Sequence, residues 1–204
     1  MFTGIIQDIA KIVWIKKCRN YFQWVIQLNN IDTNTLLLGS SISCNGCCLT
    51  IKTIINNRVS VDIIKETLRV TNLDSFCEGQ HINVERSVKF GEEIGGHLVS
   101  GHVMITAKIF KIVICNNSKK LWIELNDIIF MKYVFYKGFI CIDGISLTIG
   151  NVEKNTFCVF LIPETIFNTT IGSKNVGDLV NLEIDYLTKI TVDSIERLVL
   201  KFNR

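Results

Sequence analysis

The segment Gly46-Cys-Cys-Leu-Thr-Ile51 occurs a second time as Gly144-Ile-Ser-Leu-Thr-Ile149, 98 residues further along the chain. Two other pairs of segments share this offset: Lys65-Glu-Thr-Leu68 with Pro163-Glu-Thr-Ile166, and Gly79–Glu85 with Gly177–Glu183. Residues 39–85 and 137–183 align without a gap at 15 identities in 47 positions, whereas chance matching gives roughly three or four. The chain therefore contains two homologous halves, each the size of a small domain.

Each half has the pattern of a set of short strands. Segments such as Ile42–Ile51 are rich in Val, Ile and Thr and are bounded by Gly, Asn and Asp. Ile145, Leu147 and Ile149 alternate with polar residues, which is the period of a half-buried strand. Many closely spaced strands favour a barrel or sandwich in each half. The sequence thus predicts an all-β protein, with a glycine-rich junction near Gly91–Ser100.

Composition and charge narrow the range of functions. The 204 residues are 48% hydrophobic and 20% charged, which is typical of a globular protein. The net charge of +3 is too small to indicate nucleic acid or an acidic membrane as the main partner. No apolar run reaches the roughly 18 residues that span a membrane, and the N-terminus lacks the features of a signal peptide. We therefore expect a cytoplasmic protein.

The cysteines and histidines do not predict a metal site. Cys44-x-x-Cys47 is the only such spacing, and no second ligand pair follows at the distance of a zinc site. Small buried side chains are the favoured interpretation for most of the eight cysteines. His97 and His102 are five residues apart and would face opposite sides of a strand. His97 is by default structural, whereas His102 closes a motif, Val99–His102, that resembles Phe2–Ile5 and is the better functional candidate.

The tail after Thr191 has the pattern of an amphipathic helix. Its apolar residues fall at helical spacing and are Val192, Ile195, Leu198, Val199 and Phe202. The opposite face carries charged side chains, and the first half has no counterpart of this segment. The apolar stripe must be buried somewhere. Packing on its own barrel and self-association in a helix bundle are equally compatible with the pattern.

Polar residues recur at matched positions in the two halves. Cys48 and Thr50 lie two residues apart on a predicted strand and face the same way, as do Ser146 and Thr148. This duplication suggests two similar ligand pockets. The repeated Glu-Thr pairs cap a helix start or hydrogen-bond a ligand, and the pattern does not choose between these roles. They are Glu66 with Thr67, and Glu164 with Thr165.

The halves also differ in polarity near these strands. Gly39, Asn45 and Cys48 of the first half correspond to Lys137, Asp143 and Ser146 of the second. An aspartate can orient or deprotonate a hydroxyl, and a lysine can stabilise a developing anion. We therefore predict that the three residues of the second half form one polar cluster, in which the aspartate orients the serine.

Several segments, taken in their order and spacing, resemble riboflavin synthases of the lumazine-dismutating type. They are Met1–Ile5, Asn45–Thr50, Lys65–Leu68, Gly95–His102, Tyr136–Ile140, Asp143–Thr148 and Leu161–Thr165. The resemblance implies a six-stranded Greek-key barrel in residues 1–97, a second in 98–187, and a helix in 188–204 that packs into a homotrimer. Each barrel would bind one 6,7-dimethyl-8-ribityllumazine.

The resemblance further implies that the active site lies between the first barrel of one subunit and the second barrel of a neighbour. A four-carbon unit would pass there from one lumazine to the other, giving riboflavin and 5-amino-6-ribitylaminouracil with neither cofactor nor metal. The protein would act mainly by holding two rings face to face. Lumazine synthase is a further partner that the resemblance suggests.

The family's substrate contacts can be carried over by motif. In the first half they are Gly4, Ile5, Ile6, Cys48, Leu49, Thr50, Asp62, Ile63, Ile64, Lys65, Glu66 and Thr67, with Phe2 near the neighbouring barrel. In the second half they are Gly101, His102, Val103, Lys137, Ser146, Leu147, Thr148, Phe160, Leu161, Ile162, Pro163, Glu164 and Thr165. Backbone amides of these strands would read the pyrimidine edge.

The catalytic roles that the resemblance implies fall on five residues. Ser146 and Cys48 assist nucleophile addition at C7, Asp143 orients Ser146, and His102 and Lys137 handle protons or charge. One position departs from the family, because Phe160 is apolar where close relatives commonly carry a polar residue such as histidine. The alternative is a non-catalytic lumazine protein, which binds a lumazine or flavin as an optical antenna. The Thr-bearing strands and Glu-Thr pairs of both halves are present in this sequence, as is the terminal helix, which favours the enzyme.

Overall fold

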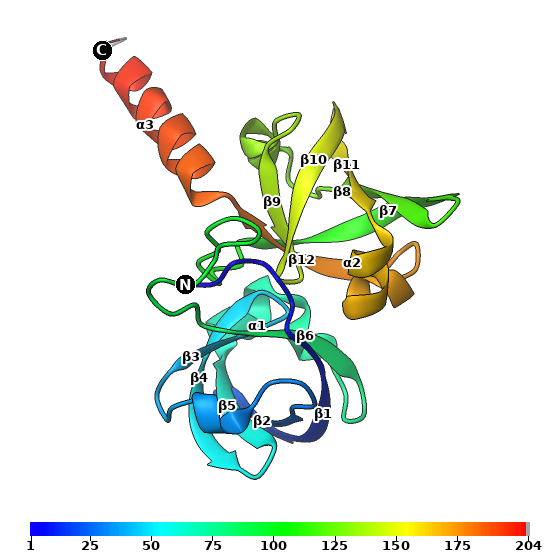
Figure 1. Ribbon diagram of the computed structural model, residues 1–204. Helices are drawn as coiled ribbons and strands as arrows, with labels where there is room; N and C mark the ends of the chain where they lie inside the picture. Colours follow the sequence, from blue (N-terminus) through cyan, green and yellow to red (C-terminus); the bar gives the residue numbers. More distant parts are fainter. Residues whose placement is uncertain (203–204) are drawn as a thin grey trace.

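Figure 1 shows a computed structural model, which describes residues 1–202, as two barrels with a helix projecting from them. The first barrel comprises β1 (Asp8–Lys17), β2 (Tyr21–Gln27), β3 (Ser41–Cys44), β4 (Cys47–Ile55), β5 (Arg58–Ile64) and β6 (His81–Arg86). The second comprises β7 (Ile105–Cys115), β8 (Ser118–Glu124), β9 (Phe139–Ile142), β10 (Ile145–Glu153), β11 (Thr156–Leu161) and β12 (Leu179–Ile184). The predicted all-β architecture with a duplicated barrel is confirmed.

The two barrels have the same topology. The first closes in the order β1-β2-β5-β4-β3-β6, and the second closes through the equivalent pairs. All strand pairs are antiparallel, and the crossover from β2 to β5 is of the Greek-key kind. Short helices follow the fifth strand of each barrel, namely α1 (Lys65–Val70) with η2 (Asn72–Ser75), and α2 (Pro163–Asn168) with η4 (Thr170–Ser173). The turns η1 (Thr33–Thr35) and η3 (Ile128–Tyr133) connect earlier strands.

Each barrel encloses its own core. Trp24, Ile51 and Ile82 are fully buried in the first barrel, and Phe157 and Leu182 are fully buried in the second. The alternate residues of the same strands face outward, as their period of two predicts. Burying each such side chain stabilises the fold by about 1.5–3 kcal/mol. The interior is therefore filled, and a ligand can bind only on an outer face.

The N-terminal segment begins between the two barrels. The Phe2 amide donates to the Val99 carbonyl oxygen at 2.8 Å, and the Val99 amide donates back at 3.0 Å. The Phe2 side chain is fully buried against Val99 and Cys141. The Phe2 ring therefore packs the two barrels together and is not exposed to either pocket in this chain.

The C-terminal helix α3 (Tyr186–Phe202) projects away from both barrels, and residues 203 and 204 of the predicted tail lie outside the described residues. Its inner turns are attached to η3, where Lys132 pairs with Glu196 and the Tyr133 hydroxyl donates to Asp193, both at 2.5 Å. Val192 packs on the second core, but most of the apolar stripe is exposed. Of the two alternatives, packing on its own barrel therefore holds for Val192, whereas the rest of the stripe is left uncovered by either barrel.

Three features bear on the class of protein rather than on the site. No helix among the described residues is long and apolar enough to cross a membrane. All eight cysteines are free, and four of them are buried, namely Cys44, Cys47, Cys141 and Cys158. In the part of the chain that the structure describes, no three His, Cys, Asp or Glu side chains converge as a metal site would require.

Candidate active site

One pocket lies on the outer face of the second barrel, around Ser146. It has a volume of about 600 Å³ and extends from β10 across β11 to α2. The lining residues are Tyr136, Lys137, Ser146, Leu147, Thr148, Ile149, Gly150, Asn151, Phe160, Ile162 and Thr165. Ser146 and Thr148 face outward on β10, as their spacing predicts. Lys137 lies at the pocket as well, at a positive φ of 66°, where the first half has Gly39.

The N-terminal segment crosses over to this pocket from the first half of the chain. The Ser146 amide donates to the Gly4 carbonyl oxygen at 2.8 Å. A Cβ on Gly4 would lie 2.5 Å from the Cβ of Ser146, and Gly4 has a φ of +76°. Only glycine satisfies both conditions, because it has no Cβ and adopts the left-handed region freely.

The Ser146 hydroxyl is in hydrogen-bond contact with the imidazole of His97. Its Nδ1 lies 2.7 Å from the Ser146 Oγ, and its ring stacks on Phe139 with centroids 5.1 Å apart. Burial lowers the pKa of the His97 imidazole below its ordinary value, so the neutral ring is favoured. The preceding residue, Gly96, is closely packed: a Cβ at this position would lie 2.3 Å from the Thr3 carbonyl oxygen. His97, structural by default, thus lies in direct contact with the Ser146 hydroxyl.

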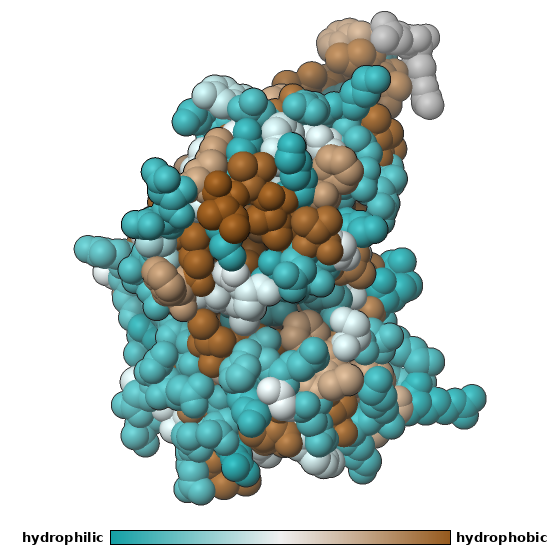
Figure 2. All heavy atoms as spheres, turned by 90° about the vertical axis from the view of Figure 1, so that its right-hand side faces the viewer, coloured by the Kyte–Doolittle hydropathy of each residue, from teal (hydrophilic) through white to brown (hydrophobic). Residues whose placement is uncertain are grey.

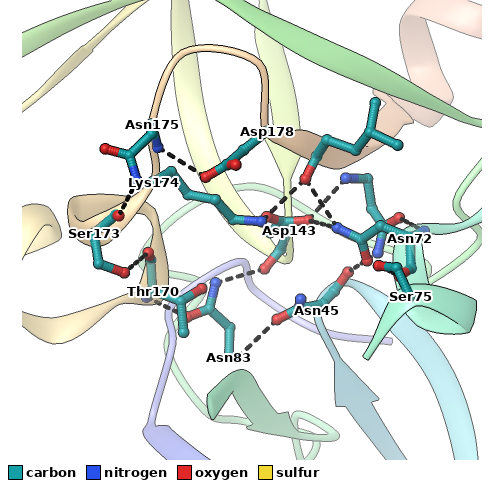
Figure 3. A network of polar contacts seen from close by, with 12 residues as sticks. Asn45, Asn72, Ser75, Asn83, Asp143, Thr170, Ser173, Lys174, Asn175 and Asp178 are labelled. Atoms are coloured by element: carbon teal, nitrogen blue, oxygen red, sulfur yellow. Dashed lines mark hydrogen bonds and ion pairs between the residues drawn. The ribbon is translucent and has the colours of Figure 1, made fainter. Parts of the chain in front are cut away.

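Asp143 does not orient Ser146, so this prediction is also wrong. Asp143 occupies the tight turn between β9 and β10 with a φ of 46°, and its side chain is fully buried between the barrels (Figure 3). Its Oδ1 accepts from the Asn181 amide at 2.8 Å and from Asn72 Nδ2 at 3.2 Å, while Lys174 Nζ lies 3.6 Å from Oδ2. Burial raises the pKa of this carboxyl despite the nearby lysine. Asp143 joins the barrels instead.

The contacts around Asp143 follow the internal repeat. Asn83 Nδ2 donates to the Asp143 carbonyl oxygen at 2.9 Å, and Asn181 Nδ2 donates to the Asn45 carbonyl oxygen at the same distance. Asn83 and Asn181 occupy matched positions in the two halves, as do Asn45 and Asp143. The pairs are therefore related by a pseudo-twofold axis, and Figure 3 shows Asn45, Asn83 and Asp143 close together.

The second pocket lies on the first barrel, around Cys48, and has a volume of about 520 Å³. Its lining residues are Cys47, Cys48, Glu66, Thr67, Arg69, Val70, Thr71, Gly101, His102, Val103, Met104, Phe130 and Lys189. The Cys48 amide donates to the Gly101 carbonyl oxygen at 2.8 Å. A Cβ on Gly101 would lie 2.5 Å from the Cβ of Cys48, as for Gly4 and Ser146 in the other pocket.

The leading segments are therefore exchanged between the halves. Gly4, Ile5 and Ile6 were expected in the first-half pocket, and Gly101, His102 and Val103 in the second. The structure places Gly4 against Ser146 and the second group beside Cys48. A carboxylate holds each segment: Glu85 accepts from the Thr3 amide at 2.6 Å and from the Gly4 amide at 3.0 Å, and its counterpart Glu183 accepts equivalently from Ser100 and Gly101.

Known proteins match this chain over most of its length. The model of the lumazine binding domain matches the chain twice, over residues 3–87 and 100–185. Riboflavin synthase of Buchnera aphidicola subsp. Baizongia pistaciae is 55% identical over 199 residues, which cover 98% of this chain and 94% of the relative. Riboflavin synthase of Escherichia coli is 50% identical, with 98% and 93% covered. The chain belongs to the riboflavin synthase family.

A crystal structure of LumP complexed with riboflavin shares the fold of this riboflavin synthase family member. The TM-score is 0.83, at 23% identity, and the match covers 90% of this chain and 99% of that chain. A LumP complex with 6,7-dimethyl-8-(1'-D-ribityl) lumazine gives a TM-score of 0.80 at the same identity, covering 90% and 98%. These likenesses concern the fold alone, whereas the identity to the synthases extends along nearly the whole chain.

The remaining predicted contacts of the riboflavin synthase site fall into three groups. Thr50 and Asp62 face outward beside the Cys48 pocket without lining it. Side chains that are exposed nearby are Ile64, Lys65, Pro163 and Glu164. Ile63 and Leu161 are fully buried in the two cores and Leu49 is nearly so, so their side chains cannot touch a ligand and only their backbone remains available.

The sequence did not predict the contacts of Glu85, Glu183, Gly96 and His97. The two glutamates are identical at matched positions of the repeat, in Gly79–Glu85 and Gly177–Glu183. That identity was a usable signal, because a carboxylate kept in both copies and buried on a strand needs partners. The contact of His97 had no such signal, since it lies in a connecting segment without a strand period.

Proposed function

We propose that this protein is a cytoplasmic transferase that converts two molecules of 6,7-dimethyl-8-ribityllumazine into riboflavin and 5-amino-6-(D-ribitylamino)uracil. The observation that carries the proposal is the presence of two related but unequal pockets on one riboflavin synthase chain. The reaction joins two copies of one molecule in different roles, as donor and acceptor of a four-carbon unit. Two pockets of common origin with different polar residues suit that requirement.

In the Ser146 pocket, Ser146 and His97 supply acid–base chemistry. With Nδ1 unprotonated, His97 accepts the proton of the Ser146 hydroxyl across 2.7 Å. The serine can then assist addition of a nucleophile at C7 of the lumazine or accept a proton from its C7 methyl group, and the histidine returns the proton later. Lys137 stabilises the anion that forms on the ring. His97 takes the role first expected of Asp143.

In the Cys48 pocket, the thiol and an imidazole are the reactive groups. Cys48 occupies the position of Ser146, and His102 lines the same pocket. Cys48 assists addition at C7 and His102 handles protons. The backbone of the neighbouring strands reads the pyrimidine edge, so that substitution of the buried aliphatic residues affects stability more than recognition. Neither role requires an oxidant, a reductant or a metal.

The complete active site is shared between subunits. The two pockets of one chain have no lining residue in common, and each lies on an outer face of its barrel. We propose a homotrimer held by α3, in which the Cys48 pocket of one subunit faces the Ser146 pocket of the next. Its largest catalytic contribution is then proximity, because two rings are held in the orientation of the reaction.

Anaerobic incubation with 6,7-dimethyl-8-ribityllumazine alone tests the proposal. Purified protein without added cofactor should produce riboflavin at half the rate of lumazine loss, with the uracil product appearing at the same rate as riboflavin. Absorbance and product chromatography follow both. Tight lumazine binding without turnover would instead support the non-catalytic antenna function, and every catalytic role given above would then be withdrawn.

A further inference from the structure

The outer wall of the Ser146 pocket differs in kind from the matched wall of the first barrel. In the first barrel, Lys52 Nζ donates a hydrogen bond to Asp62 Oδ2 at 2.8 Å. In the second barrel, the residues 98 positions further along are Gly150 and Phe160. An ion pair on one wall thus corresponds to a glycine and an aromatic ring on the other.

A β-bulge fixes this geometry in both barrels. The register of β4 against β5 shifts between Ile51 and Thr53, and that of β10 against β11 shifts between Ile149 and Val152. Lys52 and Gly150 lie at these bulges, where a strand re-aims its side chains. A Cβ on Gly150 would lie only 2.8 Å from Phe160 Cε2. The ring of Phe160 therefore occupies the space that a side chain at position 150 would need, and the two residues form a matched pair.

The Phe160 ring is available to a ligand. It is 54% exposed and lines the pocket together with Ser146. Lys120 Nζ lies 5.3 Å from its centroid and 4.7 Å from that of Trp122, so the wall combines aromatic faces with positive charge. Figure 2 shows that apolar side chains gather on this barrel more than on the first, whose same side is mostly hydrophilic.

We propose that Phe160, seated over Gly150, makes the Ser146 pocket the tighter of the two sites for the fused ring system of a lumazine or flavin, and is thus a specificity-determining residue. This inference rests on the proposed function. A flat heteroaromatic ring gains stacking and apolar contact on an aromatic face, which an ion pair does not offer. In the first barrel, Lys52 and Asp62 pair with each other at the matched positions, and neither side chain lines the Cys48 pocket.

Calorimetric titration of the full-length chain with riboflavin tests this inference. The unsubstituted protein should show two classes of site. Phe160→Ala should weaken the tighter class by about tenfold and leave the weaker class unchanged, whereas Phe160→Tyr, which keeps the ring, should retain tight binding. Phe167→Ala is the matched control, because this exposed phenylalanine lies on α2 outside the pocket. A tighter class that Phe160→Ala leaves unchanged would overturn the inference.

The reciprocal double variant Lys52→Gly with Asp62→Phe gives the first barrel the wall of the second. It should tighten the weaker class severalfold, and further weakening of that class would count against the inference. Turnover of 6,7-dimethyl-8-ribityllumazine separates the two proposals. If the unsubstituted chain turns lumazine over but Phe160→Ala binds riboflavin normally, only the role of Phe160 falls. If the unsubstituted chain neither binds riboflavin nor turns lumazine over, the proposed function is wrong as well.

Discussion

At the scale of single residues, the proposed acid–base chemistry of the second barrel depends on the contact between His97 and Ser146. We expect Ser146→Ala and His97→Gln each to lower kcat by about 10²–10³-fold, the effect of losing one positioned acid or base. Riboflavin affinity should change little, because Leu147, Thr148 and Phe160 still line the pocket. Steady-state kinetics with a parallel binding titration measures both quantities. Equal loss of kcat and affinity would indicate a structural role.

The same pair predicts the pH dependence of turnover. Burial lowers the pKa of His97 from its ordinary 6.5, so the imidazole becomes charged, and unable to accept the serine proton, only in more acidic solution. We expect kcat to fall on the acid side with a midpoint below 6.5, and this limb to vanish in His97→Gln. The folded state also binds fewer protons than the unfolded state there, so the free energy of unfolding decreases as pH falls below the unfolded pKa.

Asp143 is expected to act on stability rather than on chemistry. Asp143→Ala removes the acceptor of Asn181 and Asn72 and leaves Lys174 without its nearest carboxylate, which should lower the free energy of unfolding by about 2–4 kcal/mol. Asp143→Asn keeps the Oδ1 acceptor and copies Asn45 of the other half, so it should cost less and keep kcat. Urea unfolding and kinetics compare the two. A well-folded but inactive Asp143→Asn would restore the catalytic role.

At the scale of elements, the leading segments are held by the last strand of one barrel and complete the pocket of the other. Glu85→Gln and Glu183→Gln weaken charge-assisted hydrogen bonds to Gly4 and Gly101, respectively. Because the segments cross over, Glu85→Gln should impair the Ser146 pocket and Glu183→Gln the Cys48 pocket. Riboflavin titration of each variant should lose about tenfold affinity in one class of site only, and a different class in each variant. Loss of the same class in both would contradict the crossing.

Strand-level features were predictable because they depend on short-range periodicity. The period of two correctly placed Ser146 and Thr148 on the outer face, and the repeat correctly doubled the barrel. Asp143 is only three residues from Ser146, yet the left-handed turn before β10 directs it into the interface between the barrels. The partner of Ser146 comes from His97, and that of Cys48 from Gly101. Such long-range contacts leave no local pattern, so sequence proximity was misleading there.

At the scale of the whole molecule, α3 presents an apolar surface that neither barrel covers. Ile195 and Leu198 are 56% and 54% exposed, although residues of this kind are normally buried. We expect Ile195→Asp combined with Leu198→Asp to convert the proposed trimer into monomers, as measured by sedimentation. Both barrels should stay folded, because the contacts of α3 with the second barrel lie on other side chains, including Val192 and Asp193. Arg197→Glu, on the polar face, is the matched control and should stay trimeric.

The monomeric variant also decides where the two substrates meet. If the Cys48 and Ser146 pockets face each other only across a subunit boundary, the monomer should still bind two riboflavin molecules per chain but lose turnover by at least about 10²-fold, because the proximity of the two rings is lost while each pocket stays intact. Specific activity of the unsubstituted protein should fall on dilution in step with dissociation of the trimer. A monomer that retains full turnover would mean that both lumazines react within one chain, and α3 would then serve stability alone.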